Sequence, residues 1–416
     1  MYKLFKRPIT KTISIVIVAI TLSTIVNSYY RNIQEFIHGG LVEIWDEYPT
    51  IAEALYEVNG FVFNGKSFDQ ERKAKRTIYD GFGSVVLIAV SAPDAPELGA
   101  GRGTGFIVDV VGDTAIIVTN YHVVDQAINQ SPTFIVNVNT AGSYWSYKAT
   151  IIGHDPVSDI AVLSITKQDN EDWEAVKFAD NDSYSTGTPV VVIGHGMSMS
   201  WTSTQGHVVY KDRYGMRPYN LMVQVDAVIN QGNSGGPVFN LDGDVIGVAQ
   251  SIYSPGRKIP GWDGVGMAIS AIQAKRSVDY IRSPQYNARG YVPYVEYPFA
   301  LGSFKLEDVK DIEKEDRHYA FFDYPAAGAP VPGQKVPVKT VGELAGIQQG
   351  DILIDINGEE ISNSFNVLRM VLKAFPGDVW TVTVQRGEET VVIDVAMREV
   401  DIEKLHASLD RKQAGK

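Results

Sequence analysis

The sequence predicts a mainly β fold, in which a barrel or sandwich region precedes a smaller mixed α+β module. Short runs rich in Val, Ile and Thr recur between Gly, Asn and Asp from residue 84 to residue 249. Few segments between them have the apolar spacing of an amphipathic helix. Many short strands at such close spacing are typical of all-β barrels and sandwiches. From residue 341 onward, short helical patterns alternate with strands around Gly turns. The 416 residues are enough for two or three domains.

The N-terminus has the pattern of an export signal. Four basic residues lie between Lys3 and Lys11, and the mostly apolar run Ile13–Val26 follows without a charge. The export machinery recognises a basic cluster before an apolar run. The run is shorter than the roughly 20 residues of a membrane-spanning helix, which favours a cleaved peptide over an anchor. We expect residues 1–28 to be a signal peptide or membrane anchor and residues 29–80 to be an N-terminal extension.

The strands of the first region are expected where the apolar runs lie. One helix, Ala271–Ile281, is expected to close this region. The segment from Asn287 to Thr340 contains six prolines and a charged patch, which indicates a linker that leads into an irregular part of the next module. The expected strands are Ser84–Val90, Gly105–Val111, Ala115–Thr119, Thr133–Val138, Ile160–Ile165, Pro189–Ile193, Leu221–Val225 and Val245–Ala249.

The C-terminal module combines both kinds of element. A short helix is expected after Val341, and two later strands flank the turn Arg386-Gly387, which indicates a hairpin. The other expected elements are the strand Ile352–Ile356, the turn Asn357-Gly358, the helix Ser364–Ala374 and the hairpin strands Trp380–Gln385 and Glu389–Val395.

The composition excludes several classes of function. There are 37 Lys and Arg residues against 49 Asp and Glu, and the net charge of −12 makes nucleic acid a poor partner. The chain has no cysteine, which excludes disulfides, thiolate zinc sites and a cysteine nucleophile. There is no HExxH motif, and no metal or other cofactor is expected. The chemistry must therefore use oxygen and nitrogen groups.

The densest chemical signal is the glycine-rich loop from Asn230 to Val238. It holds Ser234 on a tight turn between two apolar strands. A hydroxyl becomes an effective nucleophile when a base takes its proton, and the oxyanion that forms needs preset donors. We expect the backbone N–H groups of Gly232 and Ser234 to be those donors. Taken alone, the loop also fits a plain glycine-rich turn.

A base and an acid are present elsewhere in the sequence. His122 lies where an apolar strand ends, and the pKa of imidazole lets it accept and return a proton near neutral pH. Asp159 begins an apolar strand, so its carboxylate can be buried enough to orient an imidazole. Asp155 is the competing carboxylate, and its position directly before Pro156 indicates a turn residue.

Three motifs occur in the order His, Asp, Ser, namely TNYHVV around His122, DIAVL from Asp159 and GNSGGPV around Ser234. Together they resemble the trypsin-like serine proteases, and within them the HtrA/DegP group of exported quality-control proteases. The segments GRGTGF, VVIGHG, DGDVIGV and GVGMAIS support this resemblance. GRGTG leads into a strand rather than a helix, so it is not read as a nucleotide loop. The resemblance implies a chymotrypsin/trypsin-like double β-barrel over residues 81–283, with the three residues as a catalytic triad in the cleft.

The resemblance also implies a function. It implies an ATP-independent serine endopeptidase that hydrolyses unfolded or misfolded proteins, is periplasmic or anchored in a membrane facing the periplasm, and assembles as a trimer or larger. In trypsin-like folds, the residue six before the nucleophile lies at the base of the specificity pocket. That residue is Val228, and we expect preference for small or medium apolar side chains. An inactive chaperone or binding scaffold with a protease fold and a narrowly targeted processing protease stay open as alternatives.

The C-terminal module resembles a PDZ domain. The resemblance rests on the segments VGELAGIQQGDILIDINGEEI and AFPGDVWTVTVQRGEE. The expected domain covers residues 284–400, and a tail of residues 401–416 follows it. PDZ domains bind peptide C-termini by adding a strand to a sheet edge. The segment Arg289–Phe304 should contain the carboxylate-binding loop, but Pro293 interrupts it and we assign no residue there. A scaffold that packs without binding peptide is the alternative for this module.

Overall fold

The structure is a computed structural model of the 416-residue chain. It contains two compact units, residues 1–76 and residues 77–416. The expected signal peptide or anchor, residues 1–28, lies outside the described residues. Within the described part, no helix combines the length and the apolar character that crossing a membrane requires. The described residues are 62–63, 66–130, 133–141, 146–168, 172–180, 183–196, 199–214, 219–252, 266–298, 340–348, 351–361, 364–403 and 405.

The described part of the first unit is small. It contains a two-stranded antiparallel pair, β1 (Val62–Phe63) and β2 (Lys66–Ser67), and the first residues of helix α4 (Phe68–Ser84). The N-terminal extension expected over residues 29–80 is therefore helical from Phe68 to its end.

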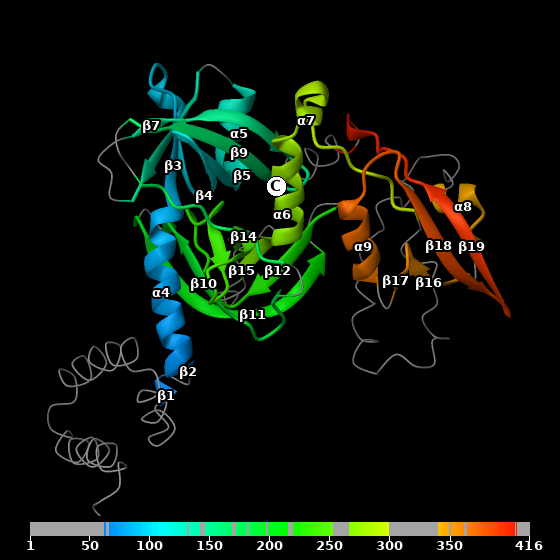
Figure 1. The fold of residues 1–416 in the computed structure, drawn as a ribbon. Helices are drawn as coiled ribbons and strands as arrows, with labels where there is room; N and C mark the ends of the chain where they lie inside the picture. Colours follow the sequence, from blue (N-terminus) through cyan, green and yellow to red (C-terminus); the bar gives the residue numbers. More distant parts are fainter. Residues whose placement is uncertain are drawn as a thin grey trace, which may run out of the picture. The chain divides into compact units, whose positions relative to one another are not determined.

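Seven antiparallel strands form the first sheet of the second unit, in the order β7-β6-β3-β4-β5-β9-β8 (Figure 1). The outermost strands, β7 and β8, are separated in the chain by Ala149 alone, and the N–H of Ala149 donates to the Val136 carbonyl at 2.9 Å. One bent strand thus pairs with both ends of the sheet, which curls into a six-stranded barrel. The strands are β3 (Val85–Ser91), β4 (Ala100–Val111), β5 (Thr114–Asn120), β6 (Ile135–Thr140), β7 (Tyr147–Lys148), β8 (Thr150–Asp155) and β9 (Ile160–Thr166).

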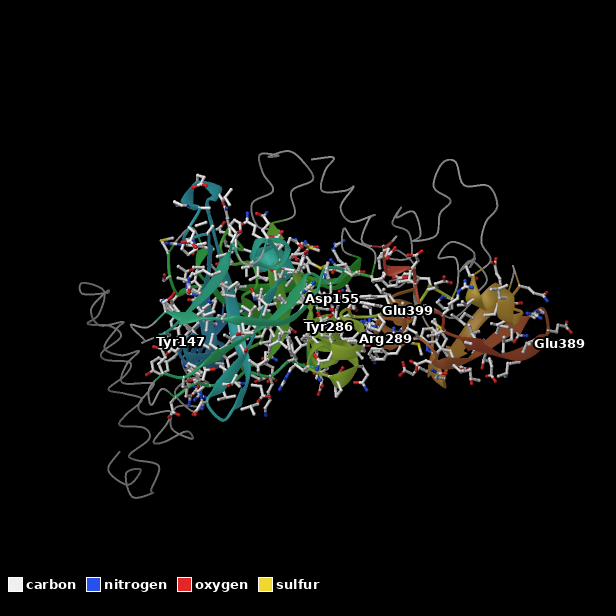
Figure 2. The ribbon with its side chains drawn as sticks, turned by 90° about the horizontal axis from the view of Figure 1, so that it is seen from above. Tyr147, Asp155, Tyr286, Arg289, Glu389 and Glu399 are labelled. Atoms are coloured by element: carbon white, nitrogen blue, oxygen red, sulfur yellow. The ribbon has the colours of Figure 1, made fainter. Side chains whose placement is uncertain are left out.

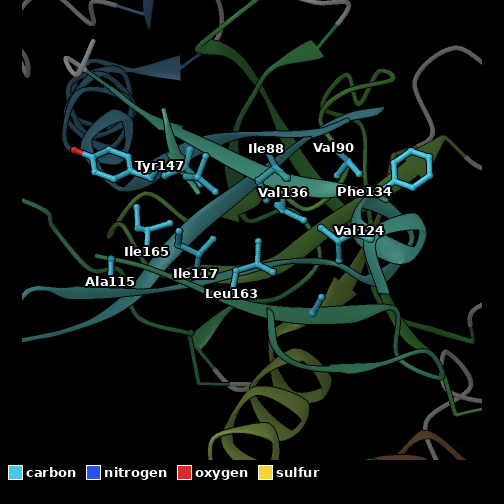
Figure 3. Close-up of a cluster of buried hydrophobic side chains, with 14 of the residues drawn as sticks. Ile88, Val90, Ala115, Ile117, Val124, Phe134, Val136, Tyr147, Leu163 and Ile165 are labelled. Atoms are coloured by element: carbon cyan, nitrogen blue, oxygen red, sulfur yellow. The ribbon is translucent and has the colours of Figure 1, made fainter. Parts of the chain in front are cut away.

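The interior of this first barrel is a single apolar cluster. Alternate residues of β3, β5, β6 and β9 contribute β-branched and leucine side chains, and Tyr147 closes one side (Figure 3). Ile88, Ile117 and Leu163 are fully buried. Burial of apolar side chains at about 25 cal/mol per Å² is the main source of stability for such a core. The strand ends that carry polar residues are therefore held by a rigid sheet.

Six strands form a closed second barrel in the order β10-β11-β12-β15-β14-β13. Val192, Val223 and Ile246 are buried in its interior. The two six-stranded barrels agree with the fold that the resemblance implied. The strands are β10 (Pro189–Gly194), β11 (Thr202–Tyr214), β12 (Leu221–Val225), β13 (Pro237–Phe239), β14 (Val245–Ile252) and β15 (Gly266–Ser270).

Two helices follow the second barrel. Helix α6 (Ala271–Ile281) has the predicted bounds and contacts β8 and β9 of the first barrel as well as β14 and β15 of the second (Figure 1). Its Ala274 and Val278 are buried. Helix α7 (Pro284–Arg289) begins with a proline and ends at Gly290 in the left-handed conformation, a common helix end.

The C-terminal module is a four-stranded sheet, β17-β16-β18-β19, with two helices. Its first helix begins with a capping box, in which Thr340 and Glu343 bond reciprocally to each other's N–H groups. Apart from β17, which was not predicted, the strands and helices match the predicted elements to within about one residue at each end, a normal difference. The elements are α8 (Val341–Ala345), β16 (Ile352–Ile356), β17 (Glu359–Glu360), α9 (Ser364–Lys373), β18 (Val379–Arg386) and β19 (Glu389–Ala396).

Candidate active site

Antiparallel pairing of β5 with β9 brings His122 to Asp159. Asn120 at the end of β5 is opposite Ile160 at the start of β9. The residues that follow β5 therefore lie beside the residue that precedes β9. Helix α5 (Tyr121–Asn129) begins directly after β5, so His122 lies in its first turn. The Nδ1 atom of His122 is 2.8 Å from Oδ2 of Asp159.

Asp159 is held by several hydrogen bonds at once. Its carbonyl accepts from the N–H of Tyr121 and from Nδ2 of Asn120, both at 3.0 Å, and its Oδ1 accepts from the N–H of His122 at 3.0 Å. Its side chain is 1% exposed, whereas that of His122 is 37% exposed. The φ angle of Asp159 is 61°, in the left-handed region that residues with a side chain rarely occupy. Such strained residues persist when their surroundings overdetermine them, as at functional sites.

Ser234 lies in the loop between β12 and β13, and this loop is bonded to both barrels. In its own barrel, the N–H of Gly235 donates to the Ala249 carbonyl at 2.8 Å. From β4 of the first barrel, the N–H of Thr104 donates to the Ser234 carbonyl at 2.9 Å. The hydroxyl of Thr104 donates to the Gly232 carbonyl at 2.7 Å. The loop is therefore fixed at the boundary between the barrels.

The residues before Ser234 form a turn that needs a glycine. The N–H of Asn233 donates to the Asn230 carbonyl at 3.0 Å, which closes a four-residue β-turn. Gly232 in this turn has a φ angle of 100°. A Cβ atom at Gly232 would lie 2.4 Å from the carbonyl oxygen of His195. Both the backbone conformation and the available space thus exclude a side chain.

The same loop orients the expected oxyanion donors. The N–H of Gly236 donates to the Asn233 carbonyl at 2.9 Å. Because the C=O and N–H of a trans peptide point in opposite directions, this bond directs the N–H of Ser234 to the other side of the chain. The N–H of Gly232 lies at the tip of the β-turn. A loop with fixed peptide groups can present donors without reorganisation.

Gln250 on β14 contacts both halves of the site. The Ser234 hydroxyl donates to the Gln250 carbonyl at 2.7 Å. The side-chain Nε2 of Gln250 donates to Oδ2 of Asp159 at 2.9 Å. Gln250 thus contacts Asp159 and Ser234, and His122 is bonded to the same Oδ2 of Asp159. In this arrangement the Ser234 proton is donated to a main-chain carbonyl.

Asp155, the competing carboxylate, has a different environment. It is 1% exposed, and its Oδ2 accepts from three hydroxyl groups that belong to its own turn, to α6 and to the segment after α7. Figure 2 shows Asp155 near Tyr286, whose hydroxyl exchanges hydrogen bonds with the main chain of His154. Asp155 therefore anchors the turn that leads to Asp159. The three donors are the hydroxyls of Ser158 at 2.7 Å, Ser277 at 2.7 Å and Tyr294 at 2.6 Å.

Two further titratable groups lie near the site. Asp125 is one helical turn along α5 from His122, and burial raises its pKa. His195 is buried beside the glycine-rich loop, and its burial lowers its pKa to about 4, because burial disfavours the charged imidazolium. The Nδ1 atom of His195 accepts from the Trp201 N–H at 3.2 Å, and its main-chain N–H donates to Thr104 Oγ1 at 3.0 Å.

Val228 presents an apolar side chain at the surface. It is 48% exposed, while its neighbour Ile229 is buried in the second barrel. The Val228 carbonyl accepts from the Thr204 hydroxyl at 2.8 Å. Its assignment to the specificity pocket stays a prediction. In the C-terminal module, the segment Arg289–Phe304 leaves the described residues after 298, and its assignment as the carboxylate-binding region also stays a prediction.

Sequence reasoning missed Thr104 and Gln250. Thr104 lies within the quoted GRGTGF segment, which was a signal for this position. Gln250 lies on β14 two residues after the quoted DGDVIGV segment, which does not include it, and its contacts depend on the docking of two barrels.

The chain is similar to two families of domains. Residues 103–248 match the trypsin-like peptidase domain, and residues 330–397 match the PDZ domain. A probable periplasmic serine endoprotease DegP-like of Rhizobium meliloti (strain 1021) is 32% identical over 322 residues, which cover 76% of this chain and 58% of the relative. A protein of the same description from Chlamydia muridarum (strain MoPn / Nigg) is 30% identical over 316 residues, which cover 75% of this chain and 56% of that relative. The chain spans a little over half the length of these curated relatives.

Solved structures share the fold. The HtrA-type protease AlgW with tripeptide has a TM-score of 0.54 at 21% sequence identity, over 79% of this chain and 97% of the solved chain. At this identity the likeness shows the fold alone. The chain thus contains a trypsin-like peptidase domain followed by a PDZ domain, and it is similar to the periplasmic serine endoproteases described as DegP-like.

Proposed function

We propose that this chain is an exported serine endopeptidase that hydrolyses unfolded or misfolded proteins without ATP, through His122, Asp159 and Ser234. The observation that carries this proposal is the 2.8 Å contact between His122 Nδ1 and Asp159 Oδ2, an oxygen that Gln250 links to Ser234. An imidazole oriented by a buried carboxylate next to a hydroxyl is suited to acyl transfer. The relatives named periplasmic serine endoproteases support the activity and an exported, periplasmic location.

The proposed reaction begins with proton transfer. His122 Nε2 takes the proton from the Ser234 hydroxyl as Oγ attacks the carbonyl carbon of the scissile peptide bond. The Ser234 proton must first turn from the Gln250 carbonyl toward the imidazole. Asp159 holds the Nδ1 proton of His122 and stabilises the imidazolium that forms.

The attack gives a tetrahedral intermediate, which breaks down to an acyl group on Ser234, and water then removes this acyl group. The N–H groups of Gly232 and Ser234 donate to the oxyanion, and the C–N bond breaks as His122 returns its proton to the departing amine. A water molecule, deprotonated by His122, then attacks the acyl carbon. The bond from that carbon to Ser234 Oγ breaks as His122 returns the proton to Oγ, which releases the carboxylic acid and regenerates the serine. Side chains of small or medium size and apolar character fit the surface at Val228, which carries no charge.

The C-terminal PDZ domain gives the proposal a second binding surface. PDZ domains add a peptide strand to a sheet edge, and peptide C-termini are the proposed ligands here. Homotrimer formation and attachment to a membrane through residues 1–28 belong to the proposal as well.

A binding scaffold that holds unfolded proteins without cutting them is the second candidate. One observation favours it, because the Ser234 hydroxyl donates to the Gln250 carbonyl at 2.7 Å. A hydroxyl in that bond is not activated until its proton turns to a base.

Substitution of Ser234 separates these candidates. Wild-type protein should cleave casein and bind a fluorophosphonate probe at Ser234, located by mass spectrometry. Ser234→Ala should lose both properties and keep its circular dichroism spectrum, while Ser203→Ala, an exposed serine on β11, should keep both properties. Cleavage by Ser234→Ala would refute the mechanism. A wild-type protein that suppresses casein aggregation without cleavage or labelling would support the scaffold.

A narrowly targeted processing protease gives a different result. It would react with the fluorophosphonate probe but leave casein intact. Where casein is cut, the sequences of the products report the residue preference at the scissile bond, and cutting mainly after Lys or Arg would contradict the role given to Val228.

A further inference from the structure

The two halves of the candidate site come from different barrels. His122 and Asp159 lie at the ends of strands of the first barrel, while Ser234 and Gln250 belong to the second. A catalytic geometry needs its groups positioned to within about 0.5 Å. Some contact must therefore set the position of the imidazole–carboxylate pair relative to the nucleophile.

Gln250 makes such a contact, because its main chain bonds to Ser234 and its side chain bonds to Asp159. Its main-chain carbonyl accepts from the Ser234 hydroxyl at 2.7 Å, and its side-chain Nε2 donates to Asp159 Oδ2 at 2.9 Å. The main chain on this side is fixed, because Ala249 exchanges two hydrogen bonds of 2.8 Å with Gly235 and Gly236. The carboxylate is thus tied to the strand against which the serine loop pairs.

The amide of Gln250 shares Oδ2 of Asp159 with the imidazole. The same oxygen accepts from Gln250 Nε2 and from His122 Nδ1, at 2.9 and 2.8 Å. Oδ1 is occupied by the N–H of His122 at 3.0 Å. With these donors in place the carboxylate can rotate little. A hydrogen bond to an ionised group is stronger than one between neutral groups.

We propose that Gln250 is a positioning residue of the triad. This proposal rests on the proposed function. Its side-chain amide fixes the Asp159 carboxylate, and through it the His122 ring, at the correct distance from Ser234 across the barrel boundary. The amide also withdraws negative charge from the carboxylate that faces His122. Gln250 therefore affects both the orientation of the imidazole and its proton affinity.

Two substitutions separate this role from simple packing. Gln250→Met keeps the length of the side chain and removes the donor. Gln250→Lys keeps a donor and adds a positive charge. Gln224→Met, on β12 of the same barrel, is the matched control for the loss of a glutamine. All variants are made in the full chain and compared by thermal unfolding.

The first readout is the titration of His122, which needs no activity. The chain has seven histidines, and the signal of His122 in spectra of ¹⁵N-histidine protein is identified by its loss in His122→Gln. The titratable groups near His122 include Asp159 from the β8–β9 turn, Asp125 and Tyr121 on α5, and His154, whose ring stacks on that of Tyr121. All variants keep them. Only the group at position 250 changes.

The expected shifts have opposite signs. Gln250→Met should raise the pKa of His122, because the carboxylate keeps more negative charge for the imidazolium. Gln250→Lys should lower it by about one unit, because a nearby like charge disfavours the imidazolium. Equal titration of His122 in wild type, both Gln250 variants and the Gln224→Met control would overturn the proposal.

The second readout is kinetic. Gln250→Met should lower kcat by roughly ten- to a hundredfold, the size expected for losing one hydrogen bond to a charged group, with little change in KM. Gln224→Met should keep wild-type kcat. If Gln250→Met keeps wild-type kcat while Ser234→Ala is inactive, the proposed function survives and the role of Gln250 is wrong. If wild type is inactive, the titration alone decides the role of Gln250.

Discussion

At the scale of single residues, the site depends on backbone conformations that only certain side chains permit. Gly232 has a φ angle of 100°, and a Cβ atom there would meet the His195 carbonyl at 2.4 Å. Gly232→Ala should therefore move the turn and displace an oxyanion donor. Loss of one such donor lowers kcat by roughly 10²- to 10³-fold. The measurement is kcat and KM on a peptide substrate, with the melting temperature recorded alongside.

A matched glycine gives the control for this prediction. Gly243 has a φ angle of 86° but no atom within 4 Å of the Cβ position. Gly243→Ala carries the same left-handed backbone cost of about 1 kcal/mol without the clash. It should lower the melting temperature by a few degrees and leave kcat unchanged. Equal kcat losses in Gly232→Ala and Gly243→Ala would mean that backbone strain, and not the position of the donor, explains the effect.

The residues of the site differ in how visible they are in the sequence. His122, Asp159 and Ser234 each lie in a local motif, and pairing of neighbouring strands brings the first two together. Gln250 contacts Asp159 only because the two barrels pack against each other, and no local sequence pattern predicts that packing. The left-handed φ of Asp159 is likewise set by bonds from other segments.

At the scale of elements, the turn between β8 and β9 is held by a buried carboxylate. Asp155 accepts from Tyr294 at 2.6 Å, and burial raises the pKa of Tyr294 well above its ordinary value. The tyrosine therefore stays protonated as a donor. Tyr294→Phe should lower the free energy of unfolding by about 1.5–3 kcal/mol, because a buried charged acceptor loses one of its donors. Chemical unfolding in urea measures the change.

The chain offers the same kind of bond in a half-buried place that water can reach. The Tyr291 hydroxyl donates to Glu399 at 2.8 Å, and the Glu399 side chain is 30% exposed. Water can replace the lost donor there, so Tyr291→Phe should cost less than about 1 kcal/mol. An equal loss of stability in Tyr291→Phe and Tyr294→Phe would contradict the role given to the buried carboxylate.

Apolar runs predicted eight of the thirteen strands that the structure describes in the two barrels, and β7, β8, β11, β13 and β15 were not predicted. The eight predicted strands and the helix α6 are confirmed. Strand β11 was missed, since its sequence TSTQGHVVYKDRY is mostly polar and its pairing with β12 shifts register twice. Helix α5 was also missed, because β-branched residues in its first turn continue the pattern of the strand before it. In both, tertiary contacts outweigh local propensity.

At the scale of the whole molecule, helix α6 connects the parts of the second unit. The Ser277 hydroxyl donates to Asp155 in the first barrel. The adjacent Arg276 donates to the carbonyls of Pro293 and Ala374 at 2.6 and 3.2 Å. The guanidinium lies over the Tyr294 ring, 4.6 Å from its centroid. The helix thus joins both barrels to the segment that precedes the PDZ domain, which no single stretch of sequence reveals.

The stability of the whole molecule should depend on pH through His195. Its folded pKa of about 4 lies below the ordinary value of 6.5, so the unfolded chain binds more protons between these two values. Stability is therefore fully present above about pH 6.5 and falls as the pH drops toward 4. The loss from this one group should reach about 2 kcal/mol at pH 5. His195→Asn keeps an acceptor for the Trp201 N–H and cannot titrate.

Urea unfolding of wild type and His195→Asn at pH 5 to 8 tests this dependence. The difference in unfolding free energy between them should change by about 2 kcal/mol in favour of the variant as the pH falls from 8 to 5. Buried carboxylates titrate in both proteins, so their contribution cancels in the difference. His207→Asn is the control, because His207 on β11 has a half-exposed side chain. Parallel pH curves for wild type and His195→Asn would show that His195 is accessible to protons in the folded state, against the burial that places it beside the glycine-rich loop.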